Sequence, residues 1–143
     1  MNQREQFGQL LGETARAWRA ALDRRLAPVG LSGARWRVLL HLARTDVPLS
    51  QKELAHRIGI EGPTLVALLD RMVQDQWVER RPSDSDRRSN TVHLTARARR
   101  TIRRIEATAA ALREELLSGV SKDELDGCAR VLARIRDRAE RRQ

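Results

Sequence analysis

Apolar residues recur at three- and four-residue intervals over four long stretches of the chain, and this period predicts amphipathic helices. The first stretch ends near Gly30, the second ends before Pro48, the third runs from about Ala96 to Leu117, and the fourth follows Ser121. The four expected apolar faces are Phe7, Leu10, Leu11, Thr14, Trp18, Ala21, Leu22 and Leu26; Trp36, Leu39, Leu40 and Ala43; Ala98, Ile102, Ile105, Ala109, Leu112 and Leu116; and Leu125, Cys128, Leu132, Ile135 and Ala139. The chain is therefore expected to be mainly α-helical.

A capping signal marks a further helix in the middle of the chain. Ser50 and Glu53 match the S-x-x-E capping box, in which the serine hydroxyl accepts a first-turn N–H and the glutamate accepts the N–H of the cap residue. A helix is therefore expected from about Gln51, and Gly59 allows a sharp turn after it. The inward face of this helix is Leu54, Ala55 and Ile58, and further caps are expected at Ser32, at Thr95 and, in a second box with Glu124, at Ser121.

The next helix is expected to run from about Gly62 to Gln74. Pro63 suits its first turn, because the first amides of a helix have no intrahelical acceptor and proline has no amide to leave unpaired. The expected buried stripe is Leu65, Leu68, Leu69 and Met72, and the opposite face is Thr64, Ala67, Arg71 and Gln74. This second face is free to meet a partner.

After Gln76 the apolar period changes from helical to alternating. Residues 77–80 and 91–94 are predicted to form two short strands, and the turn-forming residues from Pro82 to Asp86 lie between them. Arg87 and Arg88 are expected at or near the tip of this loop. Three helices followed by a hairpin with a basic loop form a winged helix-turn-helix.

The composition favours a polyanionic partner. The chain of 143 residues has the length of one domain and carries a formal charge of +9, with a pI near 11.4. A basic surface gathers phosphates and releases their counterions. A GC-rich genome also favours arginine, however, so any one arginine outside the wing is equally well explained as part of a solvated helix face.

Other residue types limit the remaining classes of function. Cys128 is the single cysteine, which excludes an internal disulfide, and its place on an apolar stripe predicts a buried small side chain rather than a reactive thiol. His41, His56 and His93 fall on different elements without acidic or thiol partners at motif spacing, so no enzyme activity, metal or cofactor is expected. The polar start of the chain and the absence of a long apolar run predict no signal peptide, no membrane span and a cytoplasmic location.

The motifs IGIEGPTLVALLDRM, WVER and SDRRS…VHLT, in this order, resemble the MarR family of transcription regulators, and most closely its SlyA-like branch. Upstream, WRAALDRRLAPVGLS and RWRVLLHL extend the resemblance over nearly the whole chain. The resemblance implies a single domain over residues 1–143, with a winged helix-turn-helix at 30–96 and helical dimerisation regions at 1–29 and 97–143. Neither end would be well buried in a monomer, and packing of both ends across a two-fold axis would form the family's homodimer.

A homodimer of this kind binds double-stranded DNA at a near-palindromic operator, with one recognition helix from each copy in the major groove. Pro63 and Thr64 are then expected near the DNA end of that helix, where a hydroxyl and unpaired amides reach phosphates or base edges. Arg71 is expected either to contact a phosphate or to pair with Asp75 one turn later.

The arginines of the wing are the other expected DNA contacts. Arg80 and Arg81 flank the loop on the incoming strand. By resemblance, Arg87 inserts into the minor groove, Asp86 holds the loop in shape, and Arg88 contacts phosphate or takes part in that internal pairing. The alternative is a free hairpin with solvated charges.

Two positions depart from the family pattern. Ala67 stands where many relatives have an arginine that reads a guanine edge, so specificity is expected to depend more on DNA shape and on the wing. Gln76 stands where a glycine usually ends the recognition helix. A glutamine there must either adopt a left-handed backbone at some cost or change the entry into the strand.

Several members of the family bind aromatic carboxylates such as salicylate. The matching positions are Arg16 and Arg19 on the first helix and Trp36 and Leu40 on the second, and two arginines with an indole would hold such an acid by charge and stacking. Core packing is the more frequent role for a tryptophan at a position such as Trp36, and its spacing fits that role, while Leu40 replaces a relative's histidine. The effector would then be different or absent.

The sequence thus leads to one main hypothesis of function and one alternative. The main hypothesis is a dimeric, sequence-specific DNA-binding transcription regulator, relieved by a small aromatic acid. The alternative is a winged domain that binds another protein, with its basic charge incidental.

Overall fold

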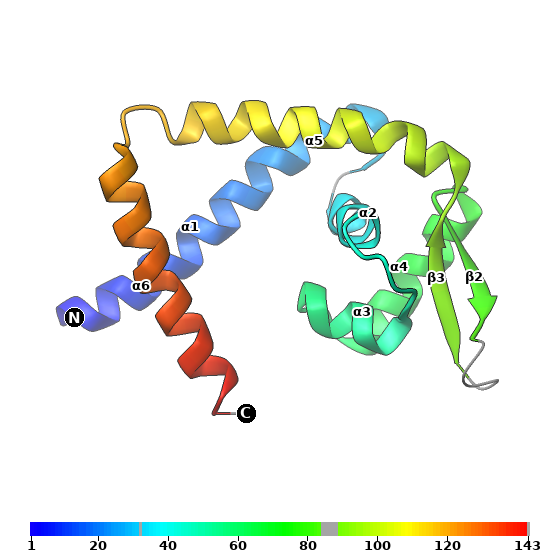
Figure 1. Ribbon diagram of the computed structural model, residues 1–143, viewed down its shortest axis with the longest axis horizontal. Helices are drawn as coiled ribbons and strands as arrows, with labels where there is room; N and C mark the ends of the chain where they lie inside the picture. Colours follow the sequence, from blue (N-terminus) through cyan, green and yellow to red (C-terminus); the bar gives the residue numbers. More distant parts are fainter. Residues whose placement is uncertain (32, 84–88, 143) are drawn as a thin grey trace. The chain divides into compact units, whose positions relative to one another are not determined.

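The computed structural model describes residues 1–31, 33–83 and 89–142, which form two compact units, Met1–Leu112 and Arg113–Gln143. The described part contains six α-helices and a three-stranded sheet (Figure 1). This confirms the expected fold class, mainly α with a small β-wing. The elements in chain order are α1 (Gln3–Leu26), the 3₁₀ helix η1 (Ala27–Val29), α2 (Arg35–Ala43), β1 (Leu49–Ser50), α3 (Gln51–Ile58), α4 (Gly62–Gln74), β2 (Val78–Pro82), β3 (Asn90–Leu94), α5 (Ala96–Leu116) and α6 (Lys122–Glu140).

The helix caps agree in part with the sequence. The Ser121 and Glu124 capping box at the start of α6 is complete. At α3 the Ser50 hydroxyl accepts the Glu53 N–H at 3.2 Å, but the Glu53 carboxylate accepts the same hydroxyl at 3.1 Å rather than the Ser50 amide. The second half of that box was therefore predicted wrongly, because the Glu53 carboxylate binds the Ser50 hydroxyl instead. Ser50 also ends β1, where it pairs with Thr91.

Two other helix starts differ from one another in their caps. The Thr95 hydroxyl accepts the Ala98 N–H at 3.1 Å, as expected for the cap of α5. The N-cap of α2 is Ala34, which has no side-chain cap bond, and not Ser32, which lies outside the described residues. The start of α1 has a capping box between Asn2 and Glu5 that the apolar pattern did not indicate.

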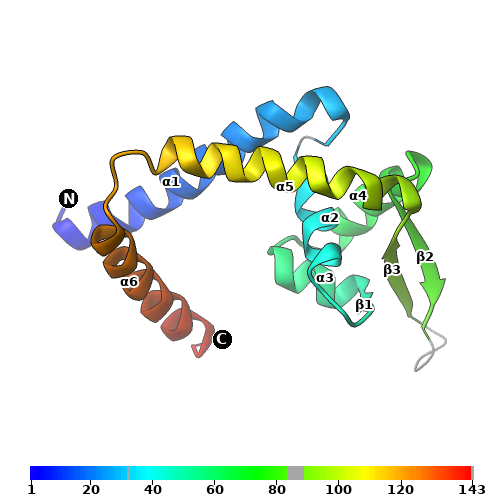
Figure 2. The same cartoon turned by 45° about the horizontal axis from the view of Figure 1, so that its top comes forward.

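The sheet has one strand more than the two expected. Its order is β1-β3-β2, and both pairs are antiparallel (Figure 2). Trp77 precedes β2 instead of opening it, and Pro82 ends β2 opposite Asn90 instead of lying in the turn. A proline is tolerated there because β2 is an edge strand, where a missing amide can face solvent.

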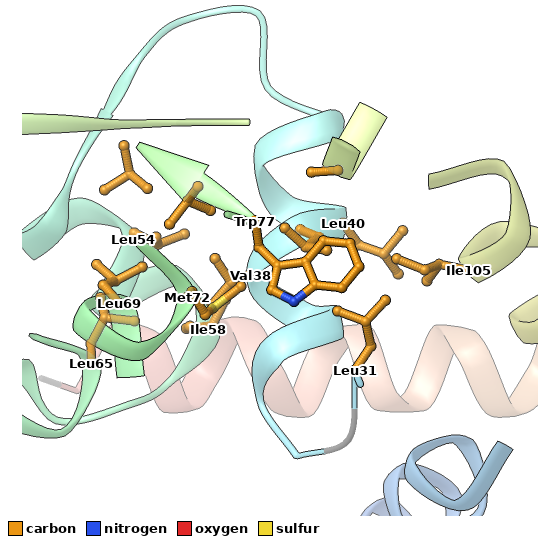
Figure 3. Packing of buried hydrophobic residues seen from close by; sticks show 14 of the residues in the cluster. Leu31, Val38, Leu40, Leu54, Ile58, Leu65, Leu69, Met72, Trp77 and Ile105 are labelled. Carbon is orange, nitrogen blue, oxygen red and sulfur yellow. The ribbon is translucent and has the colours of Figure 1, made fainter. Parts of the chain in front are cut away.

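The core lies within the first unit and contains most of the predicted inner faces of α2 to α5, but Ala43 and Leu116, which were expected on these faces, are exposed. Leu65, Leu69 and Met72 hold α4 against it and are fully buried, while Leu68 is only partly buried. Figure 3 shows the indole of Trp77 in the same cluster, beside α2. None of the buried side chains in the described part of the chain is polar or charged.

The end of α4 contains a left-handed residue that is not glycine. Gln76 has φ of 62°. Its N–H donates to the Val73 carbonyl at 3.0 Å, and the Trp77 N–H donates to the Met72 carbonyl at 2.9 Å. These two bonds form a Schellman motif. The first of the two alternatives for Gln76 is thus confirmed: the glutamine adopts the backbone that a glycine would supply.

The apolar faces of the helices near the two ends of the chain are exposed to solvent in the single chain. On α1, Phe7 is 44% and Leu10 is 60% exposed, and α6 contains no buried residue. Cys128 is also exposed, so the expectation that it is buried is wrong for the single chain. Within the described residues, no helix combines the length and the apolar character needed to cross a membrane.

Replacing Gln76 with glycine should stabilise the protein. A left-handed backbone costs a residue with a Cβ about 1–2 kcal/mol, and the extra freedom of glycine in the unfolded chain offsets part of the gain, so we expect about 0.5–1 kcal/mol more free energy of unfolding. Urea denaturation at one fixed protein concentration measures this. The control is Gln74→Gly, at a right-handed helical position of the same turn, which should instead lose about 0.5–1 kcal/mol. A destabilised Gln76→Gly variant would contradict the assignment.

Candidate nucleic-acid interface

The exposed face of α4 begins at a helix end with little side-chain capping. Its N-cap, Glu61, makes no side-chain cap bond, and Pro63 lies in the first turn. Thr64 is exposed beside it. First-turn amides have no intrahelical acceptor, so this end presents N–H donors and one hydroxyl to the surroundings. The structure therefore exposes both residues that the sequence assigned to this end.

The rest of the outward face is polar or small. Ala67, Arg71 and Gln74 are all exposed, as predicted. The Arg71 side chain reaches back to the Ala67 carbonyl at 3.5 Å. The alternative pairing of Arg71 with Asp75 was wrong, because the Asp75 carboxylate binds Arg35 Nη1 at 2.9 Å.

Arg80 on β2 has partners inside the chain. Its Nε donates to Gln51 Oε1 at 2.7 Å, and one Nη donates to the Val66 carbonyl at 3.3 Å and pairs with Asp70 at 2.7 Å. The side chain is only 24% exposed. Arg80 thus joins the wing to α3 and α4, and this role was not predicted.

Arg81 points to the other side of the strand and is more exposed. It pairs with Glu79 two residues earlier, and its Nη1 lies 3.5 Å from His93 Nδ1. Burial first, and then the positive charge of Arg81, lower the pKa of His93 below its usual value. A phosphate bound to Arg81 would have to compete with Glu79 for the same guanidinium.

The predicted wing-tip residues Asp86, Arg87 and Arg88 lie outside the described residues. The described residues on either side of them are hydrogen-bonded to each other. The Ser83 N–H donates to the Ser89 carbonyl at 3.0 Å, next to the paired ends of β2 and β3.

The four residues assigned to an effector lie on α1 and α2. Arg16 and Arg19 are exposed, Trp36 is half-buried, and Leu40 is buried in the core. The Trp36 indole N–H donates to Asp23 on α1. The only polar group of the indole therefore already has a partner within the protein, as the packing alternative requires. The effector role stays a prediction.

A polar network at the C-terminal end of α4 was not predicted. Arg35 joins Asp75 to the Gly30 carbonyl, the second bond at 3.4 Å. Arg97 on α5 donates to the Asp75 carbonyl and lies over the Trp77 ring, 3.9 Å from its centroid. These partners are far apart in sequence, so a pattern based on local spacing gives no signal for them.

Replacing Arg80 with alanine should destabilise the wing. Three partners on two helices lose their donor, and after allowance for solvent screening we expect a loss of about 1 kcal/mol in the free energy of unfolding. The matched control is Arg81→Ala on the same strand, where one exposed pair is lost and the change should stay below about 0.5 kcal/mol. Urea denaturation of both variants measures the difference. Equal losses in both variants would contradict the structural role of Arg80.

Comparison with known proteins identifies similar sequences and structures. A family model described as MarR family matches residues 29–89. The structure of transcriptional regulator PA3341 is 48% identical, covers 94% of this chain and 98% of its own, and has a TM-score of 0.87. A MarR transcriptional regulator from Methanosarcina mazei Go1 is 20% identical with a TM-score of 0.87, covering 97% of this chain and 99% of its own. The transcriptional regulator SlyA is 17% identical with a TM-score of 0.84, covering 93% of each chain. The last two support the fold alone.

Proposed function

Because the chain belongs to the MarR family of transcriptional regulators, we propose that it is a homodimeric regulator that binds a near-palindromic site in double-stranded DNA. Members of this family are regulators and not enzymes, which agrees with the expectation from the histidines. The placement in the SlyA-like branch rests on the sequence motifs quoted above. A regulator of this kind works at the chromosome, so we place it in the cytoplasm at the nucleoid.

The observation that carries the proposal is the division of α4 into two faces. Leu65, Leu69 and Met72 hold one face in the core at 0% exposure, while the other is exposed from Thr64 to Gln74. A helix fixed along one side and open along the other can enter a major groove without unfolding anything. Its N-terminal donors would then meet phosphates or base edges.

The residues on the exposed face of α4 determine which features of a base pair it can recognise. Ala67 offers a methyl group and no hydrogen bond, which suits contact with a thymine methyl rather than a guanine edge. Val66, 40% exposed, adds apolar surface beside it. Direct base recognition is thus modest, and specificity would depend on DNA shape and on insertion of Arg87 into the minor groove, with Asp86 and Arg88 supporting the loop.

Arg71 and Arg81 are the proposed phosphate contacts in the described part of the interface. Both are exposed, and neither guanidinium is enclosed by the core. Arg80 contributes by holding the wing in place through Gln51 and Asp70, and its contact with DNA remains a prediction.

The dimer follows from the apolar side chains that the single chain leaves exposed. Seven of them lie on the two terminal helices: Phe7, Leu10 and Leu11 on α1, and Leu125, Val131, Leu132 and Ile135 on α6. Exposed apolar faces of this extent favour association. A two-fold dimer would cover them and place two recognition helices about 34–36 Å apart. Cys128 on α6 would then become an interface residue.

A charge placed in this interface should separate the dimer. We expect Leu10→Glu to convert the dimer to monomer, because a buried carboxylate without a partner opposes association. Light scattering after size-exclusion chromatography measures the mass. The control is Val47→Glu, which changes an even more exposed apolar residue, 69% accessible, outside α1 and α6, and should stay dimeric. A dimeric Leu10→Glu variant would place the interface elsewhere.

DNA binding can be tested with a promoter fragment from beside the protein's own gene and a scrambled duplex, near physiological salt. The wild type should prefer the promoter, and Arg87→Ala should lose that preference. Arg71→Ala should weaken both duplexes alike and reduce the slope of log affinity against log salt by about one. The control is Arg136→Ala, an exposed arginine of α6, which should behave as wild type.

Two outcomes would contradict the proposal that the chain is a sequence-specific DNA-binding regulator. Equal and weak binding of both duplexes by the wild type, unchanged by Arg87→Ala, would remove specific recognition of that site. Binding that hardly changes with salt would favour the protein-interaction alternative, since an apolar interface releases few counterions.

An aromatic carboxylate effector is the last part of the proposal. Arg16 and Arg19 supply exposed guanidinium groups on α1, and Trp36 offers an aromatic surface on the adjoining α2. Leu40 is buried in the core, so an effector could contact it only by entering the core.

A further inference from the structure

A second basic site shares no lining residue with those assigned to the aromatic effector. It is a hollow of about 500 Å³ beside the first turns of α5, which we name the α5 hollow. Its volume is within the range of small-molecule sites. Its lining residues all belong to the first compact unit: Pro28, Val29, Trp77, Arg97, Arg100, Thr101 and Arg104.

The charge of the α5 hollow is entirely positive. Arg97, Arg100 and Arg104 contribute three guanidinium groups, and no carboxylate is among the lining residues. The three arginines share one face of α5, because residues three, four and seven positions apart are neighbours on a helix. In the described part of the chain, Arg100 and Arg104 have no ion-pair or hydrogen-bond partner. An anion bound between them would relieve their mutual repulsion.

We propose that the α5 hollow binds a small molecule that carries at least two anionic groups, phosphate or carboxylate. Guanidinium forks bind both groups in the same bidentate geometry. Pro28 and Val29 provide an apolar edge for the body of the ligand. One anionic group can bridge Arg100 and Arg104, and a second lets the ligand reach Arg97 as well, so the second anionic group is the distinguishing requirement.

The position of the hollow argues against DNA as its partner. Trp77 comes just before β2, and α5 begins just after β3 (Figure 1). The hollow is therefore at the base of the hairpin, whereas Ser83 and Ser89 are at the other end, next to the wing tip. It also adjoins the C-terminal end of α4, about 16 Å along the helix from Thr64 by the rise of 1.5 Å per residue.

The hollow has a direct connection to the recognition helix. Arg97 lines it and also donates to the Asp75 carbonyl at the end of α4. An anion that attracts Arg97 competes with that carbonyl and with the Trp77 ring. We therefore expect the bound anion to alter the affinity for DNA, and this part alone depends on the proposed function.

Calorimetric titration of the full chain at constant ionic strength tests the site. The probes are sodium pyrophosphate for phosphates, citrate for polycarboxylates, and benzoate for an aromatic acid with one charge. Pyrophosphate or citrate should bind, and the one that binds identifies the class of ligand. Arg100→Gln and Arg104→Gln should each weaken that binding about tenfold, as expected for loss of charged hydrogen bonds.

The matched control is Arg103→Gln, which removes the same charge from an exposed arginine next to Arg104 that does not line the hollow. It should bind the probe as wild type does. All three substituted arginines are exposed, so the variants should fold, and thermal denaturation verifies this. The site is overturned if neither polyanion binds, if benzoate binds as tightly as citrate, or if Arg103→Gln loses as much affinity as Arg104→Gln.

The connection to DNA binding needs a separate measurement. At a saturating concentration of the bound probe, the wild type should change its affinity for the specific duplex, and Arg104→Gln should not. If the probe binds and DNA affinity stays the same, the connection is wrong. If the probe binds and no duplex is recognised specifically, the proposed function fails and the site remains. If Arg100→Gln instead weakens every duplex and lowers the salt slope by about one, the hollow is a DNA contact and the proposal is overturned.

Discussion

The turn Asp75–Trp77 holds α4 in position, and several long-range polar contacts of the first unit meet there. Its backbone satisfies the last carbonyls of α4 through the Schellman bonds of Gln76. Its indole packs in the core, and the Asp75 carboxylate and carbonyl take up Arg35 and Arg97. The Thr95 hydroxyl donates to the Gln76 carbonyl at 2.6 Å while it caps α5. The orientation of α4 therefore depends on contacts at the end of the helix that is far from its N-terminal donors.

Positive charge in this chain has two different uses. Arg35, Arg80 and Arg97 bind carboxylates, carbonyls or an indole within the first unit, so much of their electrostatic energy stabilises the fold. Arg71 has only one long contact to a carbonyl and is exposed. An arginine paired with a carboxylate adds nothing to the net charge, so the +9 is the excess supplied by arginines outside such pairs. In the proposed complex this excess would attract DNA from a distance, while exposed arginines such as Arg71 would fix the position of the complex.

Features encoded by neighbouring residues could be predicted from the sequence. The bounds of α4, the caps at Thr95 and Ser121, and the strain at Gln76 each depend on a few consecutive residues. The pairing of Arg35 with Asp75, and of Arg80 with Gln51 and Asp70, joins residues that only the folded chain brings together. β1 was missed for the same reason, because two residues become a strand only through their pairing with β3. The α5 hollow was missed because its arginines read as an ordinary solvated helix face until Trp77 and η1 close one side.

The contacts at the end of α4 also explain how an anion in the α5 hollow can influence DNA binding at the N-terminal end of the same helix. α4 is a single helix of 13 residues, packed along one face, and a packed helix moves as a rigid body rather than bending within itself. A change in the contacts of its last turn therefore alters its tilt, and the displacement is largest at the distant N-terminal end. Arg97 either holds the Asp75 carbonyl or binds an anion in the hollow, which supplies the two discrete arrangements that coupling between two sites requires.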